Sequence, residues 1–122
     1  MVAPSCPALV IHDDDAFRKS LIATLDQKHF TVTMAIDGKA AIDAIGSRSF
    51  SVIIVGVDLG RRNGLATLDH LRANRSSIRG GVIIVGEPNP ELRNYAKVAD
   101  ETLLKPVDPS YVADRALTYC RL

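Results

Sequence analysis

The sequence lacks tryptophan and is poor in aromatic residues, which make up only 5% of its 122 residues. It also lacks long apolar runs: the longest, such as residues 51–57 and 82–85, are far too short to span a bilayer. Residues 1–7 show neither the charged start nor the apolar run of a signal peptide. These absences predict a cytoplasmic protein that makes no membrane contact.

An excess of charge of one sign is missing too. The formal net charge is +1, so no broad basic field favours direct nucleic-acid binding. No GxGxxG follows the first predicted strand, and no Ser-His-Asp or Cys-His arrangement is present. His29 and His70 share no ligand spacing and are expected on the surface. We therefore expect no catalytic residue, no cofactor and no enzyme activity.

Cysteine is scarce, with only Cys6 and Cys120, near opposite ends of the chain. Neither belongs to a CxxC pair or has metal-ligand spacing to a histidine. The favoured interpretation is two free thiols in a reducing cytosol. The alternative is a disulfide that forms on oxidation, since an alternating α/β fold would place both residues at the same pole.

What the sequence does contain is a regular alternation of apolar, strand-like runs with segments of helical spacing. The predicted strands cover residues 8–12, 30–35, 51–55, 82–85 and 102–104, and the predicted helices cover residues 15–28, 40–45, 65–74, 91–98 and 109–120. This alternation predicts one α/β domain over residues 1–122, with a parallel sheet and helices on both faces. In such a sheet, function gathers at the carboxyl ends of the strands.

Short motifs occupy those ends in a characteristic order. They are the acidic residues 13–15, Asp37 with Gly38, Asn63 to Leu65, and Lys105 with Pro106. From residue 9 to residue 117 the chain resembles the receiver domain of two-component response regulators. The resemblance implies a doubly wound, flavodoxin-like (βα)5 fold with strand order 2-1-3-4-5 and a role in phosphorelay-type signal transduction.

In receivers, two acidic residues after the first strand hold Mg²⁺, and the lysine of the Lys-Pro pair contacts the phosphoryl group. The ungapped register places His12 and Asp13 at the two acidic positions, whereas a one-residue shift would place Asp13 and Asp14 there. An imidazole prefers softer metals than Mg²⁺. We therefore expect Mg²⁺ binding at Asp13 and Asp14 to be weak or absent.

Receivers also carry a phosphoacceptor aspartate at the end of the third strand and a Ser or Thr at the end of the fourth. Counting back from Asn63, the acceptor position holds Gly56, which has no nucleophile. Gly86 stands at the hydroxyl position, and Thr102 at an aromatic position of the fifth strand. Several parts of the phosphorylation machinery are altered together, which predicts a pseudo-receiver: a phosphorylation-independent module for protein–protein interaction.

One alternative keeps phosphorylation. Asp58, two residues beyond Gly56, would act as a surrogate acceptor, with Mg²⁺ bound at Asp13 and Asp14. This hypothesis needs a rearranged loop, and a short polar residue in a Gly-rich loop more often serves the turn.

The Lys105–Pro106 pair is expected to form a sharp turn with a cis peptide bond. Lys105 would then pair with Asp13 or Asp14 as a structural salt bridge, in the absence of a ligand. This interpretation makes Lys105 and Pro106 part of the scaffold of the pocket.

Arg61 and Arg62 lie on the loop beside the altered site. They are expected to be solvated loop charges; together with Lys105 they form the third hypothesis, a sensor of small anions. The resemblance places the surface for a signalling partner on residues 91–122. The sequence does not define the partner, the oligomeric state or whether an output domain follows.

Overall fold

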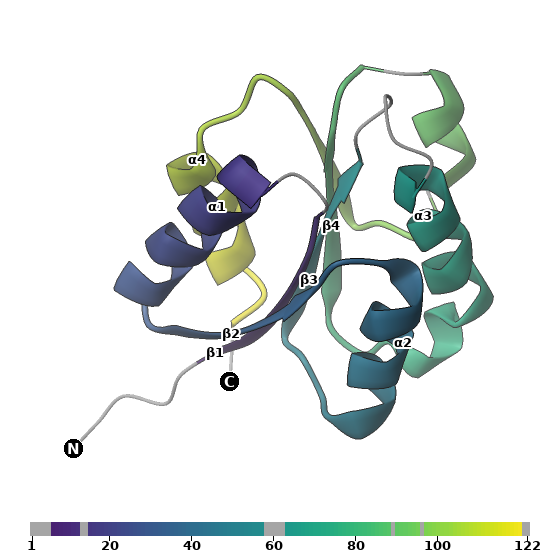
Figure 1. Ribbon diagram of the computed structural model, residues 1–122, viewed down its shortest axis with the longest axis horizontal. Coiled ribbons are helices and arrows are strands. Elements are labelled where there is room, and N and C mark those ends of the chain that lie inside the picture. Colours follow the sequence, from purple (N-terminus) through teal and green to yellow (C-terminus); the bar gives the residue numbers. More distant parts are fainter. Residues whose placement is uncertain (1–5, 13–14, 58–62, 89, 96, 121–122) are drawn as a thin grey trace.

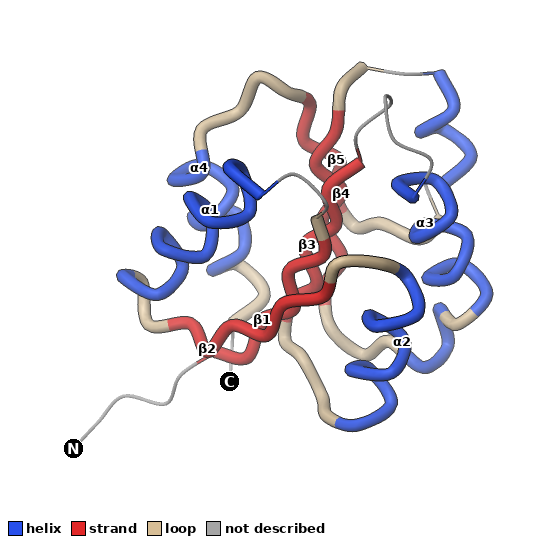
Figure 2. The backbone as a smooth tube through the Cα atoms, viewed as in Figure 1, coloured by secondary structure: helices blue, strands red, loops and turns tan. Residues whose placement is uncertain are grey.

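The computed structural model describes residues 6–12, 15–57, 63–88, 90–95 and 97–120. Five strands form one parallel sheet in the order β2-β1-β3-β4-β5, which confirms the predicted order (Figure 2). The strands are β1 (Cys6–Ile11), β2 (Phe30–Ala35), β3 (Val52–Val57), β4 (Gly81–Gly86) and β5 (Glu101–Leu104).

Helices cover both faces of this sheet, as predicted. They are α1 (Asp15–Gln27), α2 (Gly38–Ser47), α3 (Asn63–Ala73) and α4 (Pro109–Leu117), with the 3₁₀ segments η1 (Arg75–Ser77) and η2 (Pro90–Tyr95). Figure 1 shows α1 and α4 on one face and α2 and α3 on the other. Two hydrophobic clusters result, one between each helix layer and the sheet.

The central strands are the most apolar part of the core. Every residue of β3 and β4 is buried, because helices cover both of their sides. At the edge, β5 alternates between half-buried and exposed residues. None of the helices in the described part of the chain is long and apolar enough to cross a membrane.

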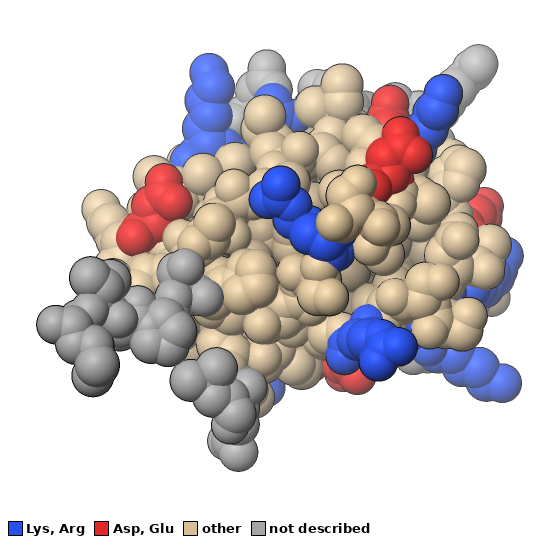
Figure 3. All heavy atoms as spheres, turned by 90° about the horizontal axis from the view of Figure 1, so that it is seen from below, with Lys and Arg blue, Asp and Glu red and all other residues tan. Residues whose placement is uncertain are grey.

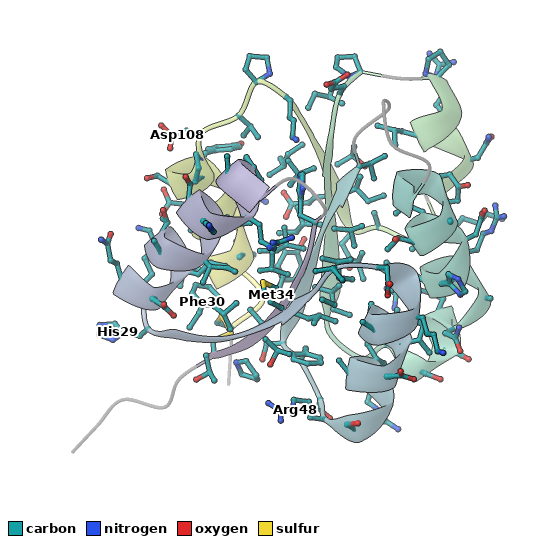
Figure 4. All side chains as sticks on the ribbon, viewed as in Figure 1. His29, Phe30, Met34, Arg48 and Asp108 are labelled. Carbon is teal, nitrogen blue, oxygen red and sulfur yellow. A yellow bond between two sulfur atoms is a disulfide. The ribbon has the colours of Figure 1, made fainter. Side chains whose placement is uncertain are left out.

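Two aspartates are the N-cap residues of helices α2 and α4. Asp37 accepts a hydrogen bond from the Ala40 amide at 2.8 Å, and Asp108 accepts one from the Ser110 amide at 2.9 Å. Figure 4 labels Asp108 at the start of α4. Gly38 follows the first cap, and a Cβ there would lie 2.6 Å from Cδ2 of His70. The Asp-Gly pair therefore starts α2 and also lets it approach α3 closely.

Most predicted boundaries differ from the structure by one or two residues, and three differences matter for the site or the fold. The helix predicted at residues 91–98 is the 3₁₀ segment η2, and the last helix ends at Leu117 rather than at residue 120. Within η2, Leu92 and Tyr95 are buried three positions apart, a spacing that a 3₁₀-helix places on one side. Gly56, predicted to open a loop, is the penultimate residue of β3.

Cys6 and Cys120 form a disulfide, so the prediction of two free thiols is wrong. Their Cα atoms are 5.6 Å apart although 114 positions separate them in sequence. Because α4 runs back toward the start of β1, the two ends of the described chain meet at one pole. The expectation that both cysteines share a pole is confirmed.

Candidate functional site

The centre of the candidate site is the contact between His12 and Gly56, at the carboxyl ends of β1 and β3. The His12 side chain is only 2% exposed. A Cβ on Gly56 would lie 1.5 Å from Cδ2 and 2.3 Å from Nε2 of His12. The imidazole thus occupies the volume that any side chain at position 56 would need.

The first turns of α1 hold the His12 residue in place. Arg18, itself buried to 8% exposure, donates a hydrogen bond from Nη1 to the His12 carbonyl oxygen at 2.6 Å. The Phe17 ring lies 5.0 Å from the His12 ring, measured between centroids. His12 is therefore positioned through its backbone and through its ring.

Lys105 reaches the same ring from the end of β5. Its Nζ lies 3.2 Å from Nε2 of His12 and 4.7 Å from the centroid of the Phe17 ring, a cation–π geometry. An ammonium group has only donors, so a hydrogen bond between these two nitrogens requires Nε2 to be the acceptor. The Lys105–Pro106 peptide bond is cis, as predicted.

An open groove of about 450 Å³ runs beside Lys105. It is lined by Phe17, Glu87, Lys105, Pro106 and Val107. In the part of the chain that the structure describes, the groove is thus lined by one cationic and one anionic side chain. Among the described residues, no three His, Cys, Asp or Glu side chains are grouped as ligands for a metal ion.

The other predicted site residues are placed as follows. Gly86 is the last residue of β4, and a Cβ there would lie 3.1 Å from the Val57 carbonyl oxygen, a tight contact. Thr102 is exposed on β5. His29 and His70 are also exposed, as predicted. Asp13, Asp14, Asp58, Arg61 and Arg62 lie outside the described residues. The Mg²⁺, surrogate-acceptor and anion-sensing hypotheses, and the salt bridge from Lys105 to an aspartate, therefore stay predictions.

Sequence reasoning missed three residues of this site. Phe17 and Arg18 were interpreted only as part of a helix, although they contact His12 directly. Glu87 follows the last residue of β4, which is a position where functional side chains are expected. That position was the available signal for Glu87; no sequence signal shows which way Phe17 and Arg18 face.

Strong electrostatic perturbation occurs elsewhere, between β5 and α4. Glu101 accepts hydrogen bonds from Arg115 Nε at 2.7 Å and from the Tyr119 hydroxyl at 2.6 Å. Burial by itself would raise the pKa of Glu101, but these hydrogen bonds outweigh burial and lower that pKa. Burial and the bond to Glu101 raise the pKa of Tyr119 to about 12. This cluster joins the last helix to the edge strand.

The family model described as "Response regulator receiver domain" matches residues 8–116. Among curated proteins, the chain is 28% identical over 103 residues to the "Transcriptional activator protein PfeR" of Pseudomonas aeruginosa, covering 84% of this chain and 34% of that protein. It is 29% identical over 103 residues to the "Regulator of RpoS" of Escherichia coli K12, covering 81% of this chain and 30% of that protein. The chain thus aligns with about a third of the length of these relatives.

Solved structures match over almost the whole chain. A CheY-like receiver domain from Methanospirillum hungatei superposes with a TM-score of 0.79 at 19% identity, covering 94% of this chain and 93% of that one. A signal receiver domain from Bermanella marisrubri gives a TM-score of 0.78 at 22% identity, covering 97% and 100%. At these identities the likeness establishes the fold.

Proposed function

Because the chain belongs to the response regulator receiver domain family, we propose that it acts in two-component signalling through protein–protein contacts that do not depend on phosphorylation. The observation that carries the proposal is the His12 imidazole in the side-chain volume of Gly56. The register of the family resemblance assigns Gly56 to the acceptor position. A glycine there supplies no carboxylate, and the ring leaves no room for one.

The contacts of Lys105 support the same proposal. A receiver lysine serves to neutralise charge on a transferred phosphoryl group. Here the ammonium already lies against the His12 nitrogen and the Phe17 ring. Lys105 therefore makes contacts with the chain's own side chains that require no phosphoryl group.

Exposed apolar side chains support a partner surface within residues 91–122. Leu104 on β5 is 51% exposed, and Tyr111 and Leu117 on α4 are 52% and 42% exposed. Tyrosine is a typical anchor residue of protein interfaces. We place the signalling partner on this segment, which the family resemblance also favours.

Phosphodonor treatment tests the proposal. The protein is incubated with acetyl phosphate and Mg²⁺ and its intact mass is measured; binding of beryllofluoride with Mg²⁺ is followed separately by NMR. We expect no stable adduct, while a phosphorylatable receiver treated in parallel gains the mass of a phosphoryl group.

Two variants make the result specific. A mass gain in the wild type that disappears in Asp58→Asn would overturn the proposal in favour of Asp58 as acceptor. The double variant His12→Asp with Gly56→Asp removes the ring and supplies a carboxylate. If only this double variant gains mass, residues 12 and 56 are the positions that prevent phosphorylation of the wild type.

A further inference from the structure

The pole opposite the Lys105 groove holds a second cavity, of about 190 Å³. It lies between the end of α2, the start of β3 and the segment that follows η1. Its apolar lining, called the floor below, comes from Ile45, Phe50, Ile53 and Ile78, of which Phe50 and Ile53 are 7% and 2% exposed. Its polar lining comes from two arginines and two serines: Arg48, Ser49, Ser77 and Arg79.

The walls of this cavity are held together by close backbone packing at Gly80. A Cβ there would lie 2.3 Å from the Phe50 carbonyl oxygen and 2.6 Å from that of Ser51. The Gly81 amide also donates a hydrogen bond to the Ser51 oxygen at 3.0 Å. The segment that carries Arg79 is thus fixed against the segment that carries Ser49, so the cavity is preformed.

The two arginines of the cavity have no carboxylate partner among the described residues. Arg48 makes one long hydrogen bond, 3.4 Å from its Nη1 to Oγ1 of Thr33. Nearby Arg75, by contrast, binds the Ile78 carbonyl oxygen at 2.9 Å and lies 3.8 Å from an Asp100 oxygen. Arg75 is therefore committed to the fold, while the guanidinium groups of Arg48 and Arg79 stay open to a ligand.

The exposed position of this pole is visible in two views. Figure 4 labels Arg48 at the lower end of the molecule, beyond the start of β3. Figure 3 shows the molecule from below, as a largely uncharged surface interrupted by separate basic and acidic side chains. The four polar lining residues are all exposed, so a small anion can approach the cavity from solvent.

We propose that this cavity binds a small phosphate monoester with an apolar body. Guanidinium groups match phosphate oxygens in bidentate geometry, and serine hydroxyls add further hydrogen-bond donors. The apolar floor would cover the organic part of the ligand. Sites for drug-sized ligands span roughly 300–1,000 Å³, so this cavity selects a smaller molecule.

The proposed ligand site is independent of the proposed function, because the cavity shares no lining residue with the Lys105 groove. The two sites therefore give separable results. A ligand bound near Arg48 leaves His12 and Lys105 untouched, and a phosphodonor experiment reports only on the other pole.

Phenyl phosphate is the test ligand, with inorganic phosphate and benzoate as comparison probes. Thermal shift and NMR titration are measured on the wild type, Arg48→Gln, Arg79→Gln and the double variant. Arg93→Gln removes an exposed arginine of η2 outside the cavity and serves as the matched control.

We expect phenyl phosphate to raise the melting temperature of the wild type and of Arg93→Gln. Its affinity should fall at least about tenfold in each cavity variant, since a hydrogen bond to a charged group is lost. Weaker binding of inorganic phosphate would confirm the role of the apolar floor. No binding to the wild type, unchanged binding to the double variant, or tighter binding of benzoate would overturn the proposal.

Discussion

Gly56 and His12 share one side-chain volume, which makes the two positions dependent on each other. The Cβ that any substitution at position 56 adds would fall 1.5 Å from Cδ2 of the imidazole. Real Cβ atoms do not approach this closely, so the ring must move. Lys105 and Phe17 would lose their contacts with it.

A double-mutant cycle measures this dependence. Gly56→Ala in the wild type is expected to lower the free energy of unfolding by about 1–3 kcal/mol, the usual cost of overpacking a core. In a His12→Ala background the same substitution has space, and its cost should largely disappear. Urea unfolding of the four proteins gives a coupling energy expected at about 1 kcal/mol or more, as for residues in contact. Additive effects of the two substitutions would contradict the packing.

His29 is strained in a different way, because its φ angle is +68°. It lies in the turn between α1 and β2, in the left-handed region where a glycine has no Cβ penalty. His29→Gly is expected to be neutral or to stabilise by up to about 1 kcal/mol, and His29→Val to destabilise by about 1–2 kcal/mol. Denaturant melts compare the two. If the His29→Val variant is as stable as the His29→Gly variant, the positive φ angle at position 29 costs no stability, which would contradict the prediction.

At the residue scale, the sequence identified the positions of the site better than their contacts. Gly56, His12 and Lys105 were all singled out, because they stand at the carboxyl ends of strands. The ring of His12 over Gly56 was not foreseen, since spacing along a chain carries no information on rotamers. For the same reason, the contact of Lys105 with the His12 imidazole was not predicted.

At the scale of elements, the last helix is tied to the edge strand by one polar cluster. Glu101 on β5 accepts hydrogen bonds from Arg115 on α4 and from Tyr119 just beyond it. Because the folded state lowers the pKa of Glu101 below 4.5, the ionised carboxylate contributes stability above that value. This contribution is lost as the pH falls through the lower pKa of the folded protein.

Glu101→Gln tests the pH dependence. The variant is expected to be less stable than the wild type near neutral pH, and the difference should shrink as acid protonates Glu101 in the wild type. Urea unfolding at a series of pH values between neutrality and about pH 3 measures the difference. Glu87→Gln, at an exposed carboxyl with no ion pair among the described residues, is the control. A difference that stays constant with pH would refute the assignment.

The elements themselves were predictable to different degrees. The strands β3 and β4 consist of Val, Ile and Gly only, so their burial on both faces and their parallel pairing followed from composition. The segment η2 was mistaken for an α-helix. Its buried residues recur every third position, and over so short a stretch the two periods are hard to distinguish.

At the scale of the whole molecule, the disulfide changes the unfolded state more than the folded one. The bond between Cys6 and Cys120 spans 114 positions, and a long closed loop removes much entropy from the unfolded chain. Replacing both cysteines by serine is expected to lower the free energy of unfolding by about 2–5 kcal/mol. Urea unfolding with and without reductant measures this loss.

Reductant provides the control for that experiment. It should lower the stability of the wild type to that of the double serine variant and leave the variant unchanged. A wild type that does not respond to reductant would show that the bond contributes nothing. Sequence distance could not reveal the pairing, because only the return of α4 brings the two cysteines together.

The same disulfide bond closes the chain between Cys6 and Cys120 into a covalent ring, which runs through the two cysteine side chains. A protease that cuts one connection inside the ring releases no fragment until the sulfurs are reduced. Because the ring is closed at this pole, new chain ends can be opened elsewhere in it by circular permutation. A circular permutant opened in the turn after α2, with a short linker across the old ends, keeps every strand neighbour of the sheet.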